Sequence, residues 1–190
     1  HDVVNIVTIS AAAKVDTGTD SDLITVGSES DTVPGALGGI QDVLTLVGGP
    51  AARVDNDRLS ISNVKSSVDT VGLLWPQRLV GLGMTQPVAD GPVYGPTAPA
   101  GSTNQRSLPP RVGSTIVAGK GAGAIWYDQF DELNLYLGDG KDAFTVWDTT
   151  EGVIQTNINT NGGEDFVQVK RTGPKSQVII DSGDEPTVRN

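Results

Sequence analysis

Residues 131–146 read DELNLYLGDGKDAFTV. This stretch holds two copies of one five-residue pattern: an aspartate, any residue, an apolar residue, a small polar residue and an apolar residue. Asp131 leads the first copy and Asp142 leads the second. Apolar and polar side chains alternate with a period of two, which is typical of a β-strand with one buried face. The stretch therefore predicts two short strands joined by a glycine-rich turn.

The same pattern occurs six times along the chain, with Asn, Thr or Gln as the fourth residue. The leading residues are Asp2, Asp22, Asp42, Asp131, Asp142 and Asp165. Asp22 follows Asp2 at the same interval at which Asp42 follows Asp22, and the interval from Asp142 to Asp165 is only slightly longer. A strand that recurs at such a period is typical of a solenoid, in which each coil stacks on the previous one. We therefore predict an all-β fold, a parallel β-solenoid resembling a β-helix or β-roll.

Shorter second strands are expected between the aspartate-led ones. They end in an apolar residue, Asp or Asn and a small residue, as in Val15-Asp16-Thr17, Ile158-Asn159-Thr160 and Ile180-Asp181-Ser182. Each coil is predicted to point apolar side chains inward, where each buried one contributes roughly 1.5–3 kcal/mol. The predicted inward residues are Val4, Ile6, Val15, Ile24, Val26, Leu44, Leu46, Val54, Phe144, Val146, Ile158, Val167, Val169 and Ile180.

The domain organisation is predicted from the residues at which the repeated pattern stops and resumes. Residues 1–63 and 125–190 carry the repeated pattern and are predicted to be coils of one domain. Residues 64–124 hold most of the eleven prolines, and proline removes a donor from a strand ladder. We predict a long Pro/Gly-rich insertion there, pinned back by its apolar pieces 71–75 and 79–84. The alternative fold is a β-sandwich, which would have antiparallel hairpins instead of parallel coils.

A longer period is also visible. The pattern at Asp2 resembles the one at Asp165, and Val15-Asp-Thr-Gly resembles Ile180-Asp-Ser-Gly. The chain is therefore predicted to hold slightly more than one unit of a long tandem array, within a longer protein.

Composition excludes several classes of function. The chain of 190 residues carries 13 Lys and Arg against 23 Asp and Glu, a net charge of −10. Such an acidic chain is a poor partner for nucleic acid or anionic membranes. It has no cysteine and one histidine, so zinc sites and histidine-dependent nucleophiles are not expected. We predict that the protein is not an enzyme.

The turns resemble the calcium-binding nonapeptide repeats of RTX-type (hemolysin-type) secreted proteins, whose pattern is Gly-Gly-x-Gly-x-Asp-x-apolar-x. Gly138-Asp-Gly-Lys-Asp-Ala-Phe144 keeps most of that pattern, and residues 18–24 and 161–167 keep less of it. The resemblance implies calcium bound by carboxylates of stacked turns. The candidate ligands are Asp20, Asp22, Asp139, Asp142, Asp165 and Asp181. The alternative is that these residues only form turns, since Asp and Asn bond their own backbone there.

Most of the chain outside residues 85–124 also resembles a tandem β-solenoid repeat of giant secreted or surface proteins. Residues 79–84 and 125–146 carry this resemblance. It implies a structural repeat unit of an extracellular or cell-surface filament, fibre or adhesin stalk. The expected partners are neighbouring copies or repeats of the same chain, stacked end to end, and surface glycans.

A carbohydrate-binding or carbohydrate-acting β-helix is the competing hypothesis. Trp126, Tyr127, Asp128 and Asp131 lie close together in the sequence. A glycosidase or lyase site needs only paired carboxylates, and the aromatic rings could form a sugar-facing platform beside them. If these side chains pack into the core instead, this hypothesis loses its basis.

Overall fold

The structure is a computed structural model that describes residues 1–27, 36–50, 56–84, 123–149, 153 and 155–182. The predicted all-β class is confirmed. The described residues form two β-sheets and one short 3₁₀ turn, η1 (Leu37–Gly39). The predicted inward residue Val54 lies outside the described residues.

The first sheet has six strands, all parallel to their neighbours, in the order β1-β3-β5-β9-β11-β13. The strands are β1 (Val3–Ile6), β3 (Leu23–Val26), β5 (Arg58–Ser62), β9 (Glu132–Tyr136), β11 (Gln155–Asn159) and β13 (Gln177–Asp181). The register is continuous, since the first residue of each strand is paired with the first residue of the next.

The second sheet has seven strands in the order β12-β10-β6-β7-β8-β4-β2. The strands are β2 (Ala13–Asp16), β4 (Val43–Val47), β6 (Val71–Trp75), β7 (Arg78–Gly81), β8 (Ala124–Asp128), β10 (Ala143–Val146) and β12 (Phe166–Val169). Strand β7 pairs antiparallel with both neighbours, and the other pairs of this sheet are parallel. The sheet is therefore mixed.

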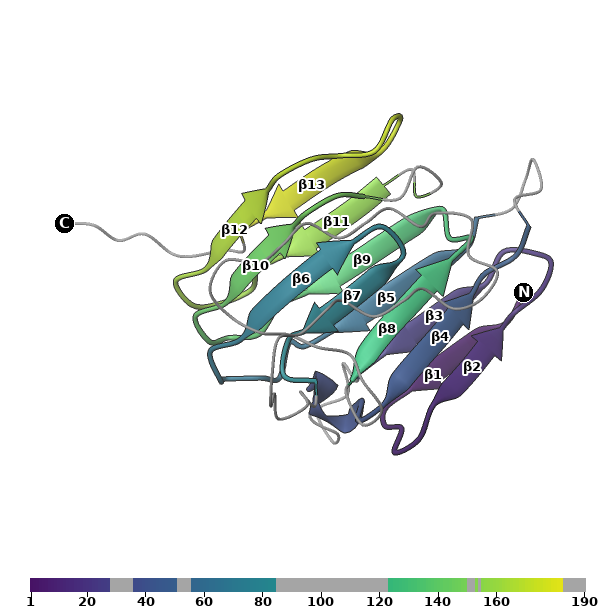
Figure 1. The fold of residues 1–190 in the computed structure, drawn as a ribbon, viewed down its shortest axis with the longest axis horizontal. Helices are drawn as coiled ribbons and strands as arrows, with labels where there is room; N and C mark the ends of the chain where they lie inside the picture. Colours follow the sequence, from purple (N-terminus) through teal and green to yellow (C-terminus); the bar gives the residue numbers. More distant parts are fainter. Residues whose placement is uncertain (28–35, 51–55, 85–122, 150–152, 154, 183–190) are drawn as a thin grey trace, which may run out of the picture.

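The chain alternates between the two sheets for most of its length. Consecutive strands such as β3 and β4 lie in different sheets, and the chain then returns beside the strand it left. Figure 1 shows the strands side by side along the long axis, with β1 and β2 at one end and β12 and β13 at the other. The hairpins that a β-sandwich requires are absent from the described strands except around β7.

The core lies between the two sheets, because alternate side chains of each strand point inward. Strands β3, β4 and β9 show this directly, with buried and half-buried residues in strict alternation. Seven predicted inward residues are fully buried: Ile24, Val26, Leu44, Leu46, Phe144, Val146 and Ile158. Val4, Ile6, Val15 and Val167 pack against this core and are partly buried. The list of predicted inward residues does not include eight further core residues: Leu59, Ile61, Leu74, Leu79, Ile125, Tyr127, Leu133 and Leu135.

Equal spacing along the sequence does not mean equal spacing in space. The segment from Asp2 to Asp22 connects neighbouring strands β1 and β3 of one sheet. The equally long segment from Asp22 to Asp42 connects β3 to β4, which lies in the other sheet. The prediction of one aspartate-led strand per coil is therefore wrong, because such strands occur in both sheets.

The predicted insertion of residues 64–124 is integrated into the seven-stranded sheet at its described ends. Strands β6 and β7 are sheet members, and Leu74 and Leu79 are fully buried between the sheets. Strand β8 begins at Ala124 and pairs with both β7 and β4. Residues 85–122 of the predicted insertion lie outside the described residues.

Candidate functional site

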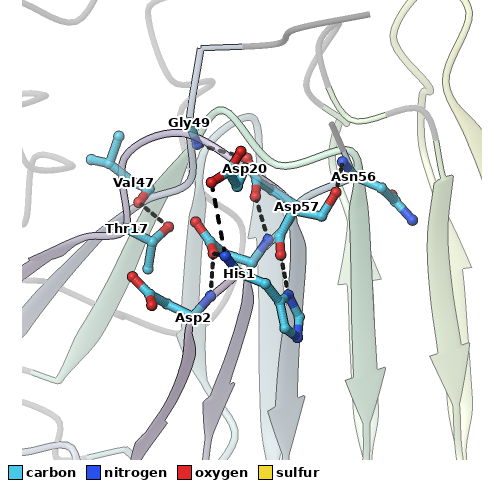
Figure 2. A network of polar contacts seen from close by, with 10 residues as sticks. His1, Asp2, Thr17, Asp20, Val47, Gly49, Asn56 and Asp57 are labelled. Carbon is cyan, nitrogen blue, oxygen red and sulfur yellow. Dashed lines mark hydrogen bonds and ion pairs between the residues drawn. The ribbon is translucent and has the colours of Figure 1, made fainter. Parts of the chain in front are cut away.

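A ladder of aspartates runs along one side of the structure, immediately before four strands of the six-stranded sheet: β1, β3, β5 and β9. The backbone N–H of Asp2 donates to the Asp22 carboxylate at 2.5 Å, and the N–H of Asp22 donates to Asp57 at 2.8 Å. The N–H of Asp57 then donates to Asp131 at 3.0 Å. Each carboxylate thus holds the backbone of the neighbouring strand, and Figure 2 shows the part of this network around Asp2 and Asp57.

A second ladder precedes three strands of the seven-stranded sheet. The N–H and the hydroxyl of Thr70 both donate to Asp142 Oδ1, at 2.8 and 2.7 Å. The N–H of Asp142 donates to Asp165 at 2.8 Å. Thr70, Asp142 and Asp165 directly precede β6, β10 and β12, so the same device recurs on the other sheet.

The ladders satisfy backbone donors at positions where the chain has just left a turn. Asp22, Asp57 and Asp142 are at most 2% exposed, and a buried charge is costly unless it accepts several hydrogen bonds. The second oxygen of Asp57 accepts from Gly49 N–H at 2.7 Å, and that of Asp142 accepts from Gly138 N–H at 2.9 Å. Hydrogen bonds to a charged group contribute about 1.5–3 kcal/mol each. The aspartates therefore link neighbouring strands through hydrogen bonds from their carboxylates to backbone N–H groups.

Sequence reasoning missed Asp57, which is central to the first ladder. Asp57-Arg-Leu-Ser-Ile is a seventh copy of the pattern, with Ser in the fourth place where the other copies have Asn, Thr or Gln. A search that allowed any small polar residue there would have found it. The ladder passes over residues 58–130 in a single step, from Asp57 to Asp131.

We expect Asp57→Asn to lower the free energy of unfolding by about 2–3 kcal/mol. Asparagine keeps one acceptor oxygen but turns the other into an NH₂ group, which faces the N–H of Asp22 or Gly49. Urea unfolding followed by circular dichroism measures the loss. The matched control is Asp16→Asn, because the Asp16 side chain is 52% exposed and its ion pair with Lys14 lies at the surface. Equal stability of the two variants would contradict the ladder.

The six predicted calcium ligands are distributed over different surroundings. Asp22, Asp142 and Asp165 accept backbone N–H groups in the ladders. Asp20, Asp139 and Asp181 are exposed. The described residues contain no group of three or more His, Cys, Asp or Glu side chains arranged to hold a metal ion. Asp184 and Glu185, two further acidic residues that follow Asp181 in the sequence, lie outside the described residues. Calcium binding stays a prediction.

Two predicted ligands, Asp20 and Asp22, belong to the turn before β3, and Figure 2 shows His1 and Asp20 in this turn. The amino group of His1 lies 3.9 Å from the Asp20 carboxylate and 4.0 Å from that of Asp22. The His1 ring also donates to the carbonyl of Ser21. The second oxygen of Asp22 is buried and has no hydrogen-bond partner in the described part of the chain. This turn thus holds one unsatisfied acceptor beside an exposed carboxylate.

The glycines of the turns allow neighbouring turns to approach closely. A Cβ on Gly138 would lie 2.3 Å from the carbonyl oxygen of Ser66, and a Cβ on Gly163 would lie 2.1 Å from that of Gly140. Gly163 also has φ of +103°, which disfavours any side chain. Tight stacking therefore accounts for Gly138 and Gly163, whereas a Cβ on Gly18, in residues 18–24, would meet nothing within 4 Å.

A cluster of Trp75, Arg78 and Trp126 lies where β7 meets its neighbours. The guanidinium of Arg78 lies 5.1 Å from the Trp75 ring centre and 5.4 Å from that of Trp126, within reach of a cation–π interaction with each. Arg78 is 2% exposed, and this burial lowers its pKa to about 10. The two rings thus hold a charged group that water hardly reaches.

The residues of the predicted carbohydrate platform do not share one surface. Tyr127 is buried in the core, and its hydroxyl donates to the Trp75 carbonyl. Asp131 belongs to the ladder, whereas Asp128 is exposed and accepts from Gln77 at 2.6 Å. The arrangement does not present a carboxylate pair beside a ring face.

The two ends of the structure leave strand edges and core side chains uncovered. At one end, Val169 and Ile180 point inward but are 40% and 45% exposed. Their paired neighbours Val146 and Ile158 are at most 1% exposed. Strands β1 and β2 form the opposite end and alternate only between exposed and half-buried residues. An additional strand pair at either end would complete the burial.

No protein-family model, curated protein or solved structure matched this chain. In the described residues, no helix has the length and apolar character needed to cross a membrane.

Proposed function

We propose that this chain is a structural repeat unit of a long extracellular fibre, filament or adhesin stalk. In this proposal it is a β-solenoid whose ends stack on neighbouring copies or repeats. The observation that carries the proposal is the pair of uncovered ends. An edge strand is a template for further pairing, and a stacked-repeat fold continues until something covers its last coil.

The chain path supports the solenoid part of the proposal. The chain returns to each sheet beside the strand it left, so the parallel pairs β1–β3, β3–β5 and β11–β13 accumulate along one axis. The aspartate ladders run along the same axis. Both features extend by addition of the next pair of strands, which is what a fibre requires.

Calcium is the proposed stiffening ion of the turns, with Asp20 and Asp22 as the strongest candidates. Among the described residues, one buried oxygen of Asp22 has no hydrogen-bond partner, and Asp20 lies on the same turn. Calcium takes six to eight oxygen ligands, so backbone carbonyls and water would have to complete the shell. We do not extend the proposal to carbohydrate chemistry, because Tyr127 and Asp131 have structural roles.

The proposal predicts that the isolated chain associates end to end as its concentration rises. Replacing both Val169 and Ile180 with lysine places charges on the uncovered core, so association should fall at least tenfold. Sedimentation velocity over a hundredfold concentration range measures the effect.

The matched control is Val71→Lys, because Val71 is 48% exposed but lies on β6, away from both ends. This variant should associate like the original chain. A chain that stays monomeric throughout, or that loses association equally in both variants, would count against stacking through the ends.

A further inference from the structure

The two ends of the chain have related sequences but lie on opposite sheets. Asp2-Val-Val-Asn-Ile resembles Asp165-Phe-Val-Gln-Val, and residues 15–18 resemble residues 180–183. In the structure β1 belongs to the six-stranded sheet, whereas its counterpart β12 belongs to the seven-stranded sheet. Strands β2 and β13 show the reverse relation. Strands that correspond in sequence therefore lie in opposite sheets.

The number of passes between the sheets explains this exchange. From β1 to β11 the chain visits the six-stranded sheet five times and the other sheet four times, with β6, β7 and β8 counted as one visit. The number of visits is odd, so the counterpart of β1 arrives in the opposite sheet. One unit of the longer period thus spans four and a half coils.

We propose that successive copies of this unit in the fibre are related by a half-turn about the long axis. The partner is a second copy of this chain, whose β1 and β2 take the places of β12 and β13. This inference rests on the proposed function, since it describes how the proposed repeats join.

The half-turn preserves the contacts at the joint. Asp2 takes the place of Asp165, whose carboxylate accepts the N–H of Asp142 at 2.8 Å. Val4 takes the place of the inward residue Val167, which is paired with Phe144. Stacking without rotation would instead put Asp2 where Ser176 stands, and Ser176 is bonded to Thr149. The half-turn therefore continues the second aspartate ladder, and stacking in phase does not.

The half-turn also sets which side of the fibre each sheet faces in successive copies. The Trp75–Arg78–Trp126 cluster belongs to the seven-stranded sheet, so it would face opposite sides of the fibre in successive copies. A partner that recognises this sheet would find its sites alternating along the two sides.

Disulfide trapping in a tandem chain tests the half-turn. Residues 1–163 are followed directly by a complete second copy, and the chain has no cysteine of its own. In the half-turn arrangement, Val3 of the second copy pairs with Ala143 of the first, as Phe166 does here. In the unrotated arrangement, it pairs with Gln155, as Gln177 does. Paired strands lie about 4.7–4.9 Å apart, within the range that a disulfide spans.

Three cysteine pairs are compared after mild oxidation, on non-reducing gels and by mass spectrometry. The positive control is Ala143→Cys with Phe166→Cys in the single full chain. The half-turn predicts that Ala143→Cys with Val3→Cys of the second copy forms a disulfide to a similar extent, at least tenfold more than Gln155→Cys with Val3→Cys.

The outcomes separate the two proposals. A disulfide from Gln155 would overturn the half-turn and leave end-to-end stacking in place. If neither tandem pair reacts while the control does, the copies do not stack, and both the half-turn and the proposed repeat function are overturned.

Discussion

Asp142→Ala is expected to lower the free energy of unfolding by about 3–5 kcal/mol. The change removes the acceptor of three hydrogen bonds, from Thr70 N–H, the Thr70 hydroxyl and Gly138 N–H. Asp142, Thr70 and Gly138 are all buried, so the two backbone donors lose their partners without gaining water. Each unsatisfied buried donor costs about 1–3 kcal/mol. Urea unfolding followed by circular dichroism gives the difference directly.

Asp139→Ala is the matched control for this experiment. It removes the same charge three residues earlier, in the same turn, from a side chain that is exposed. A surface change of this kind costs within about 0.5 kcal/mol. A loss at Asp142 no larger than that at Asp139 would contradict the ladder as the main role of these carboxylates.

The same two variants test calcium. If calcium binds this turn as the sequence resemblance implies, millimolar calcium should raise the unfolding temperature of the original chain, and EGTA should reverse the rise. Loss of that rise in Asp139→Ala would assign the exposed carboxylate to the ion. If the difference in unfolding temperature between the two variants is the same with and without calcium, the role of Asp142 is to accept hydrogen bonds from the backbone and not to bind the ion.

The strands were predictable from the sequence because burial on one face imposes a period of two. The pattern at Asp22 and Asp142 correctly predicts β3 and β10 and their fully buried residues Ile24 and Phe144. The sheet to which each strand belongs was not predictable, because a segment that crosses between the sheets can be as long as one that returns to the same sheet. Local pattern does not distinguish these two paths.

The role of the aspartates was only half visible in the sequence. Six of them were correctly placed directly before a strand, but hydrogen bonds such as the one from Asp57 to Asp131 join residues 74 positions apart. Such contacts depend on which strands become neighbours. Strands β6 and β7 were missed as sheet members for a related reason, since the prolines around them obscured a short buried segment.

Gly81→Ala is expected to lower the free energy of unfolding by about 2–5 kcal/mol. Gly81 has φ of +88°, and an alanine Cβ there would lie 1.9 Å from the carbonyl oxygen of Val71. That carbonyl is already held by Leu82 N–H at 2.9 Å. The left-handed backbone costs a side chain about 1–2 kcal/mol, and overpacking adds about 1–3 kcal/mol.

Gly83 provides a control that isolates the clash. It has φ of +78°, but a Cβ there would meet nothing within 4 Å. Gly83→Ala should therefore cost only the backbone strain, about 1–2 kcal/mol. Urea unfolding of both variants measures the difference, and equal losses would show that the approach to Val71 does not constrain the fold.

The position of β7 adds a second consequence to Gly81→Ala. In the described seven-stranded sheet, β7 alone joins the group β12-β10-β6 to the group β8-β4-β2. A displaced β7 would leave the two halves of the molecule connected through the six-stranded sheet only. Unfolding of Gly81→Ala should then lose cooperativity, with a smaller denaturant dependence than Gly83→Ala, because a drop in that slope signals departure from two-state behaviour. A full-sized slope with reduced stability would instead mean that β7 adapts in place and the sheet stays continuous.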